Sequence, residues 1–261
     1  MNSLKYIFLG STSFSQEVLL HLMSHGYIPE LIFTMPKAFK ISYSDTQVVN
    51  RNFFDLSSIA EEMNIPCYEI GSKNGKKLDD YIELIQGLNV DVIVVAGWYY
   101  MLTKSVRNSV KNGAWGVHAS LLPRYAGGAP LTWAIINGEK EAGVTLFRLE
   151  DGVDDGDIIM QKSFSIEHED SIKQVYEKAT QVTKEIIIDA FNRIDSLNYI
   201  PQDKSRIEVY PQRNPDDGEI DLSKPSIDIY NFIRAQSAPY PGAFIRTIDG
   251  KKLILEKARI E

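Results

Sequence analysis

The chain contains little cysteine and little histidine. Cys67 is the only cysteine in 261 residues, so the sequence excludes disulfides within the chain and cysteine-based zinc sites. The four histidines, His21, His25, His118 and His168, show no spacing typical of metal ligands. We therefore expect no metal centre.

Long hydrophobic runs and an excess of positive charge are also absent. The apolar stretch at residues 1–10 is too short to cross a membrane, and it lacks the basic region and cleavage site of a signal peptide. The formal net charge of -7 gives no electrostatic footprint for a nucleic acid, although a basic cluster at 73–77 could still contact phosphates. These features favour a cytoplasmic protein with neither a membrane nor a large RNA as its partner.

Short apolar runs and amphipathic segments alternate along residues 5–149. The apolar runs are typical of buried strands and the segments between them of helices. Such alternation produces right-handed βαβ crossovers, so we expect an α/β fold whose open, mostly parallel twisted sheet carries helices on both faces. The expected strands lie at 5–9, 29–35, 65–70, 91–97, 113–120 and 143–149, and the expected helices at 15–23, 52–64, 77–89, 103–112 and 130–138.

The remainder of the chain predicts a smaller, separate unit. A long amphipathic helix at 171–194 closes a first domain at 1–195, and a polar, proline-containing stretch at 196–225 is predicted to be a tether. Residues 226–261 predict a short helix followed by a β-hairpin that turns at Asp249-Gly250. Because a two-stranded hairpin is marginal on its own, it must pack on the first domain or on a second subunit, and we expect a homodimer.

A histidine and an acidic loop are the candidates for chemistry. His118 ends one predicted strand, and the loop EDGVDDGD at 150–157 follows the next. Taken alone, a histidine at a strand end is more often structural and an acidic loop is usually a solvated turn. Open sheets of this class place the carboxyl ends of their strands at one crevice, where a carboxylate could orient an imidazole for proton transfer. The turn after the first strand lacks the G-x-G-x-x-G pattern, so dinucleotide binding has little support.

A longer motif carries a resemblance to a known family. The stretch HASLLPRYAGGAPLTWAIINGEKEAGVTL at 118–146, followed by GVDDGDI at 152–158, resembles the folate-dependent formyltransferases. Further agreement lies in FLGSTSFS at 8–15, YPQRNPDDGEID at 210–221 and IRAQSAPYPGAF at 233–244. The resemblance covers most of the chain and is strongest to nucleotide-sugar N-formyltransferases, including the formyltransferase half of the UDP-4-amino-arabinose enzyme, and to methionyl-tRNA formyltransferases. It implies the Rossmann-like formyltransferase fold.

The resemblance also implies a reaction and its catalytic residues. A formyl group would pass from the co-substrate N10-formyltetrahydrofolate to a primary amine, with His118 as proton acceptor and Asp154 as the carboxylate that orients it. The family has an asparagine two residues before this histidine, where the present chain has Gly116. Another donor such as Asn112 or a backbone amide could substitute, the enzyme could be slower, or the chain could be a non-catalytic relative that binds folate or a nucleotide sugar. Ala126 stands where the aminoarabinose enzyme has arginine, which puts an anion or acceptor contact in doubt.

The same resemblance places the folate between two loops. Its pterin would lie between the segment after the strand at 91–97 and the acidic loop, held largely by backbone groups. The turn at 120–123 and a glycine beyond it would line the approach of the folate. The residues so predicted are Tyr100, Met101, Leu102, Glu150, Asp151, Gly152, Val153 and Asp154 for the pterin, and Ser120, Pro123 and Gly128 for the approach.

The acceptor amine is the least determined part of the prediction. The acidic charge balance and the segments at 213–221 and 239–244 favour a UDP- or dTDP-linked amino deoxysugar, a precursor of a cell-surface polysaccharide, over transfer RNA or glycinamide ribonucleotide. Methionyl-tRNA is the alternative acceptor. The sequence specifies neither the sugar nor the nucleotide.

Overall fold

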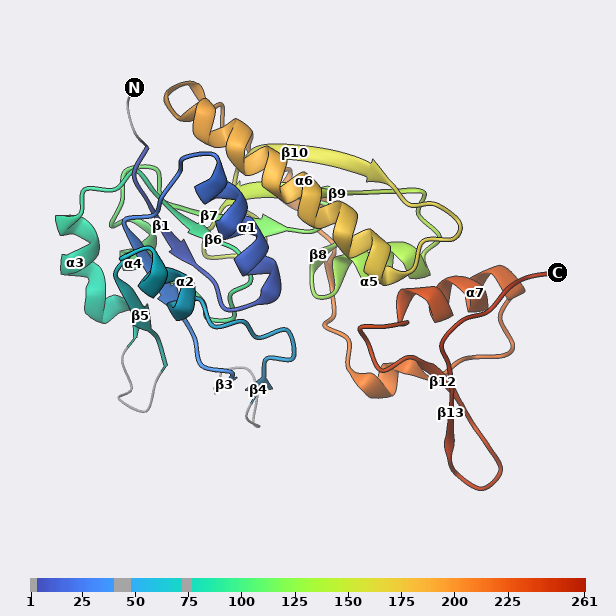
Figure 1. The fold of residues 1–261 in the computed structure, drawn as a ribbon. Coiled ribbons are helices and arrows are strands. Elements are labelled where there is room, and N and C mark those ends of the chain that lie inside the picture. The colour runs from blue at the N-terminus through green and yellow to red at the C-terminus, as the bar shows by residue number, and fades with distance from the viewer. Residues whose placement is uncertain (1–3, 40–47, 72–76) are drawn as a thin grey trace.

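A computed structural model describes residues 4–39, 48–71 and 77–261 (Figure 1). Most of the basic cluster predicted at 73–77 therefore lies outside the described residues. The central feature is a seven-stranded sheet with the strand order β10-β9-β7-β6-β1-β2-β5. Its strands are β1 (Tyr6–Leu9), β2 (Leu31–Thr34), β5 (Cys67–Glu69), β6 (Val92–Val95), β7 (Ala114–His118), β9 (Glu141–Arg148) and β10 (Ile158–Ser165).

Five of these strands are parallel, which confirms the predicted α/β fold. The strands β5, β2, β1, β6 and β7 pair in parallel, whereas β9 runs antiparallel to β7 and β10 antiparallel to β9. The direction of the strands therefore reverses at β9, so the sheet is not parallel throughout. One consequence is that the acidic loop after β9 starts at the amino end of β7, because Trp115 pairs with Arg148.

Helices cover both faces of the sheet because successive strand residues point to opposite sides. In β1, Tyr6 and Phe8 pack against α1 (Ser13–Ser24) and α6 (Ile172–Asn192), whereas Ile7 and Leu9 pack on the other face. That second face is covered by the 3-10 turn η1 (Leu78–Tyr81), α3 (Ile82–Gly87) and α4 (Lys104–Arg107). The remaining helices of the first domain are α2 (Ser57–Glu62), beside β5, and α5 (Pro130–Ile136).

Several predicted helices are shorter than their apolar patterns indicated. The helix expected at 103–112 ends at Arg107, after the Thr103 hydroxyl caps its start by accepting from the Val106 amide. The helix expected at 77–89 divides into η1 and α3. The long helix α6 agrees closely with its prediction, since its apolar stripe is continuous along the helix.

The predicted tether is packed against the first domain. Within it, β11 (Val209–Tyr210) pairs in parallel with β8 (Ala126–Gly127), and Ile200 bridges to Ile158. Buried carbonyl groups need hydrogen-bond donors, and a side chain of this segment donates to carbonyl groups of the loop after β9. The segment also contains three 3-10 turns: η2 (Ile194–Ser196), which begins just before it, η3 (Lys204–Arg206) and η4 (Pro215–Gly218). The boundaries of the domains at 195 and 225 stay a prediction.

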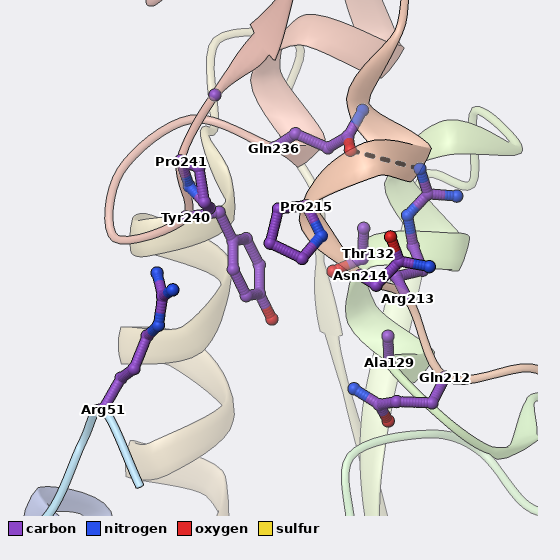
Figure 2. A pocket seen from close by; sticks show the side chains of 11 residues that line it. Arg51, Ala129, Thr132, Gln212, Arg213, Asn214, Pro215, Gln236, Tyr240 and Pro241 are labelled. Carbon is purple, nitrogen blue, oxygen red and sulfur yellow. Dashed lines mark hydrogen bonds between the residues drawn. The ribbon is translucent and has the colours of Figure 1, made fainter. Parts of the chain in front are cut away.

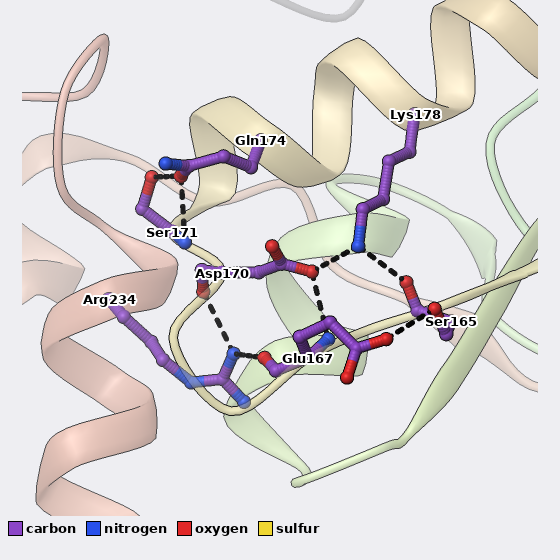
Figure 3. Close-up of polar contacts among 7 residues, drawn as sticks. All are labelled: Ser165, Glu167, Asp170, Ser171, Gln174, Lys178 and Arg234. Atoms are coloured by element: carbon purple, nitrogen blue, oxygen red, sulfur yellow. Dashed lines mark hydrogen bonds and ion pairs between the residues drawn. The ribbon is translucent and has the colours of Figure 1, made fainter.

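The C-terminal unit consists of α7 (Ser226–Ala235) and the hairpin of β12 (Ala243–Arg246) with β13 (Lys252–Leu255). Helix α7 packs against α5. Figure 3 shows how Arg234 of α7 also reaches the loop before α6, where it donates to the carbonyl oxygens of Glu167 at 3.1 Å and Asp170 at 2.8 Å. The same loop is held to α6 by Lys178, which pairs with Asp170 at 2.6 Å. These contacts fix α7 to the first domain.

The hairpin itself leaves apolar side chains in solvent. Leu253 and Ile254 are each more than half exposed, and a homodimer stays a prediction. A small sheet of β3 (Ala38–Phe39) and β4 (Val48–Val49) completes the strands of the described ranges. Among the described residues, no helix combines the length and apolarity that crossing a bilayer requires.

Substitution of Trp115, on the strand that ends at His118, tests how much core packing contributes to stability. The Trp115 side chain is fully buried among the residues between the sheet and α6, and its indole donates to the Asn112 carbonyl at 3.2 Å. We expect Trp115→Ala to lower the free energy of unfolding by about 3–5 kcal/mol through the cavity it creates. Urea denaturation followed by circular dichroism measures this. Leu20→Ala, on the exposed face of α1, is the control and should change stability by less than about 0.5 kcal/mol.

Candidate active site

His118 ends β7 with its imidazole buried between two loops. The Nε2 atom lies 2.7 Å from the carbonyl oxygen of Tyr125, and the Nδ1 atom lies 3.4 Å from Oδ2 of Asp154. A carbonyl oxygen can only accept a hydrogen bond, so Nε2 carries the hydrogen in the neutral ring. Nδ1 is then the atom that can take up a proton, and the carboxylate beside it stabilises the imidazolium that results.

Asp154 reaches this position because its loop folds back along β7. The loop leaves β9 beside the start of β7, where the Leu149 amide donates to the Ala114 carbonyl at 2.8 Å. It then returns toward His118, and the Gly127 amide donates to Oδ2 of Asp154 at 2.8 Å. The expectation that His118 and the acidic loop meet is correct, but its stated reason is wrong. The two strands are antiparallel, so their carboxyl ends do not share an edge of the sheet.

The predicted tether fixes this loop in place. The side-chain amide of Gln202, nine-tenths buried, donates to the carbonyl oxygens of Asp154 at 2.8 Å and Gly156 at 2.7 Å. Lys204 adds an ion pair to Asp155 at 2.7 Å. Two carbonyl groups of the loop are thereby satisfied by one side chain, which holds the acidic residue against the histidine.

The backbone around the histidine is strained. Among the described residues, five other than glycine have positive φ, and three of them lie at this site: Tyr125 at 56°, Ala129 at 49° and Asp154 at 50°. Side chains with a Cβ atom adopt this left-handed region uncommonly and at a cost. Such strain is concentrated at functional sites, where the surrounding structure enforces a geometry that the chain would not adopt alone.

A cavity of about 390 Å³ opens beside Asp154. Two of its apolar side chains, Met101 and Val153, are 70% and 52% exposed, whereas Leu102 is buried. Exposed apolar side chains on facing loops are typical of a site that accepts a flat, partly apolar ligand. Trp98 also lines the cavity, and its indole N–H lacks a hydrogen-bond acceptor among the described residues. The lining thus suits a heteroaromatic ring with acceptor atoms.

Charged and phenolic groups border this cavity. Arg107 lines it and donates to the carboxylate of Asp151, which lowers the pKa of that carboxyl. Burial, with a smaller contribution from Glu69, raises the pKa of the Tyr100 phenol. Tyr125 does not line the cavity; burial raises its pKa to about 12, so this phenol stays protonated and donates to Glu139 at 2.8 Å. Within the described ranges, no cluster of histidine, cysteine or acidic residues has the arrangement of a metal site.

Comparison with known proteins identifies the family. Residues 4–191 match the family described as formyl transferase, and residues 213–261 match the formyl transferase C-terminal domain. The chain belongs to the formyl transferase family. It is an N-formyltransferase, and its activity is folate-dependent formyl transfer.

Relatives of two kinds resemble this formyltransferase. The methionyl-tRNA formyltransferase of Citrifermentans bemidjiense is 32% identical over 94% of this chain and 74% of its own length, and that of Caldanaerobacter subterraneus is 29% identical over 98% and 81%. A sugar N-formyltransferase from a Shewanella species shares the fold with a TM-score of 0.72 at 16% identity over 100% of both chains. An N-formyltransferase from Helicobacter canadensis, in complex with folinic acid and dTDP-3-aminofucose, does so with a TM-score of 0.66 at 20% identity over 89% of this chain and 80% of that one.

The predicted folate residues divide into two groups. One group lines the cavity and comprises Tyr100, Met101, Leu102, Glu150, Gly152, Val153 and Asp154, with Asp151 reaching it through Arg107. The other group, Ser120, Pro123 and Gly128, does not line it. Ser120 is buried and donates to the Arg124 carbonyl at 2.7 Å, and the backbone of Gly128 packs against Gln212. In this formyltransferase these three residues shape the turn after β7.

Asn112 cannot replace the missing asparagine. It precedes β7, whose five residues span about 13 Å in extended form, whereas His118 is the last residue of that strand. Gly116 lies next to the cavity, and a Cβ atom there would meet Cδ2 of Leu149 at 2.5 Å. Leu149 therefore occupies the space into which a side chain at position 116 would extend. Ala126 is fully buried and paired in β8, so it makes no contact with the cavity.

Three further groups at the site are not marked by any sequence pattern. Gln202 lies 48 residues beyond Asp154 in a stretch that resembles a linker, and no motif marks it. The Tyr125 carbonyl is a backbone group that any residue could supply. Arg107 ends α4, and no pattern in the sequence marks it as the partner of Asp151.

Gln202 should act as a positioning residue for Asp154. Gln202→Ala removes both donors to the loop carbonyls, and we expect kcat for formyl transfer to fall about tenfold or more, as misplacement of a catalytic group does, with little change in the KM for folate. Steady-state kinetics measures this. Gln202→Glu keeps the shape but cannot donate, so it should resemble the alanine variant. Wild-type kcat in both variants would contradict the role.

The crowding at Gly116 predicts an energetic coupling to Leu149. Gly116→Asn forces the new side chain against Leu149, and we expect a loss of about 1–3 kcal/mol in the free energy of unfolding. Combined with Leu149→Ala, the loss should be smaller than the sum of the two single changes, because the second substitution opens the space. Urea denaturation of all four proteins measures the coupling. Gly87→Asn, where a Cβ atom meets nothing within 4 Å, is the matched control.

Proposed function

We propose that this protein transfers a formyl group from N10-formyltetrahydrofolate to the primary amine of a nucleotide-linked amino deoxysugar. The observation that carries the proposal is the placement of Nδ1 of His118 beside Asp154, which itself lines the cavity that also holds Met101, Leu102 and Val153. The co-substrate would occupy this cavity between the loops after β6 and β9. The likeness of the fold to sugar N-formyltransferases supports the choice of acceptor.

The geometry supports proton transfer by His118. A neutral amine attacks the formyl carbon of the co-substrate and forms a tetrahedral adduct with negative charge on oxygen and positive charge on nitrogen. Nδ1 of His118 takes the proton from that nitrogen, and Asp154 stabilises the imidazolium that results. The bond between the formyl carbon and N10 then breaks, the adduct collapses to the formamide, and the proton passes to N10 of tetrahydrofolate.

The charge on the adduct oxygen requires a donor. The Gly127 amide is already bonded to Asp154, and Gly116 has no side chain. Protonated His118 would carry a hydrogen on Nδ1 and could donate it to that oxygen. One residue would then serve both as proton acceptor and as partner of the oxyanion.

Methionyl-tRNA is the second candidate acceptor. It is favoured by sequence identity to methionyl-tRNA formyltransferases of up to 32%. The net charge of -7 argues against it, because binding to a polyanion gains much of its affinity from clustered lysine and arginine.

One assay separates these functions. The protein is incubated with N10-formyltetrahydrofolate and, in parallel, with UDP- and dTDP-linked amino sugars or with charged methionyl-tRNA, and products are followed by mass spectrometry. We expect the mass gain of one formyl group on an amino sugar. Formylation of methionyl-tRNA alone would replace the proposed acceptor, and formylation of neither acceptor would contradict both choices.

His118→Ala and Asp154→Asn test the catalytic pair. We expect each to lower kcat by about a hundredfold to ten-thousandfold, the usual contribution of general acid–base catalysis, while circular dichroism shows an unchanged fold. The control is Asp249→Asn at the tip of the hairpin, which removes the same charge far from the cavity. Activity near wild type in either variant of the pair would remove that residue from the mechanism.

A further inference from the structure

A second cavity lies next to the folate cavity. Its volume is about 220 Å³, and Figure 2 shows its lining side chains converging from the segment after β4, the start of α5, the predicted tether and the turn after α7. The two cavities are separated by one turn of chain, since Gly127 lines the first and Ala129 the second. Two residues span at most about 7 Å, so a ligand of moderate size could reach from one cavity into the other.

The charge of this second cavity is entirely positive. Arg51 and Arg213 line it, and its lining contains no aspartate or glutamate. Arg51 is exposed and makes neither an ion pair nor a hydrogen bond within the part of the chain that the structure describes. In a protein with a net charge of -7, an arginine without a carboxylate partner at the rim of a cavity indicates an anionic ligand.

Arg213 is held in place by aromatic rings and neutral hydrogen-bond acceptors, and the Asp217 carboxylate only partly opposes the effect of burial on its pKa. Its guanidinium lies over the rings of Trp133 at 4.8 Å and Phe232 at 5.5 Å. It donates to the carbonyl oxygen of Asp217 at 2.6 Å and to the side-chain oxygen of Gln236 at 3.1 Å, both neutral acceptors. Burial lowers the pKa of Arg213, which shows that desolvation of this charge is costly. An anion in the cavity would offset that cost.

The remaining lining suits a nucleoside. Figure 2 shows the ring of Tyr240 beside Pro215, with Arg51 and Arg213 to either side in this view. The Tyr240 phenol is hydrogen-bonded to that of Tyr176 in α6, which fixes the orientation of the ring. A fixed aromatic ring between charged donors offers a stacking surface for a base next to contacts for phosphate.

We propose that the second cavity binds the diphosphate of the acceptor, with Arg51 and Arg213 as its charged donors and Tyr240 as the surface against which the base stacks. This proposal rests on the proposed function. A nucleotide-linked amino sugar bound in this way would direct its sugar past Ala129 and Gly127 toward His118, because this turn connects the two cavities. The arginines would act in binding and orienting the acceptor and would take no part in proton transfer.

The direct test is calorimetric binding of dTDP and UDP to the full chain. We expect Arg51→Ala to weaken binding of the preferred nucleotide about ten- to hundredfold, the loss typical of a charge-assisted hydrogen bond, and high salt to weaken wild-type binding. Arg51 has no partner in the described residues, so the variant should fold normally. Arg193→Ala, which removes the same charge from the exposed far end of α6, is the matched control and should bind like wild type.

Arg213→Lys gives a second measurement. It keeps the charge but loses the planar group that lies over Trp133 and Phe232, and we expect nucleotide binding to weaken with 5-formyltetrahydrofolate binding unchanged. In kinetics with an amino-sugar nucleotide, Arg51→Ala should raise the KM for the acceptor and leave kcat near wild type. A fall in kcat with unchanged KM would overturn the binding role.

The outcomes separate this inference from the proposed function. If an amino-sugar nucleotide is formylated but Arg51→Ala and Arg213→Lys bind dTDP and UDP as tightly as wild type, the proposed function stands and the location of the diphosphate is wrong. If neither nucleotide binds wild-type protein and only methionyl-tRNA is formylated, both fail. Binding that depends on both arginines, together with sugar formylation, supports both.

Discussion

The site depends on one contact, the carboxylate of Asp154 beside the imidazole of His118. The direction of the two neighbouring strands does not by itself produce this contact. Because β9 is antiparallel to β7, the loop after β9 begins at the amino end of β7, whereas His118 lies at the carboxyl end. The loop must therefore return along β7 to bring Asp154 to 3.4 Å from His118. Three constraints maintain this path: the Gly127 amide on the carboxylate, the Gln202 amide on two loop carbonyls, and a left-handed backbone at Asp154. The strained residue is held by hydrogen bonds from elements distant in sequence.

The same contacts divide the space around the histidine. The pairing of β8 with β11 brings the predicted tether against the turn after β7, so that this turn has the cavity beside Asp154 on one side and the arginine-lined cavity on the other. A segment that appears to be a linker in the sequence thus supplies Gln202 to the acidic loop and Arg213 to the second cavity. The arrangement gives a single turn contact with both cavities.

Gly116 shows how a missing side chain can be accommodated. The space beside it is filled by Leu149, and the backbone of the loop continues from there toward Asp154. The packing of Leu149 therefore leaves no room for a side-chain amide at position 116. Asn112 lies beyond the far end of β7 and cannot supply an amide there either.

Much of this protein could be predicted from its sequence because the relevant signals are local. Alternating apolar runs and helical stripes specified the α/β fold, the length of α6 and the hairpin, and a contiguous motif marked His118, Asp154 and the acidic loop that lines the first cavity. The tertiary structure decided what depends on contacts between distant segments: the reversal of β9, the path that brings Asp154 back to His118, the packing of residues 196–225 on the first domain, and the meeting of Arg51 with Arg213. Strand direction and long-range contacts follow from burial and hydrogen bonding summed over the whole chain, and no local pattern encodes them.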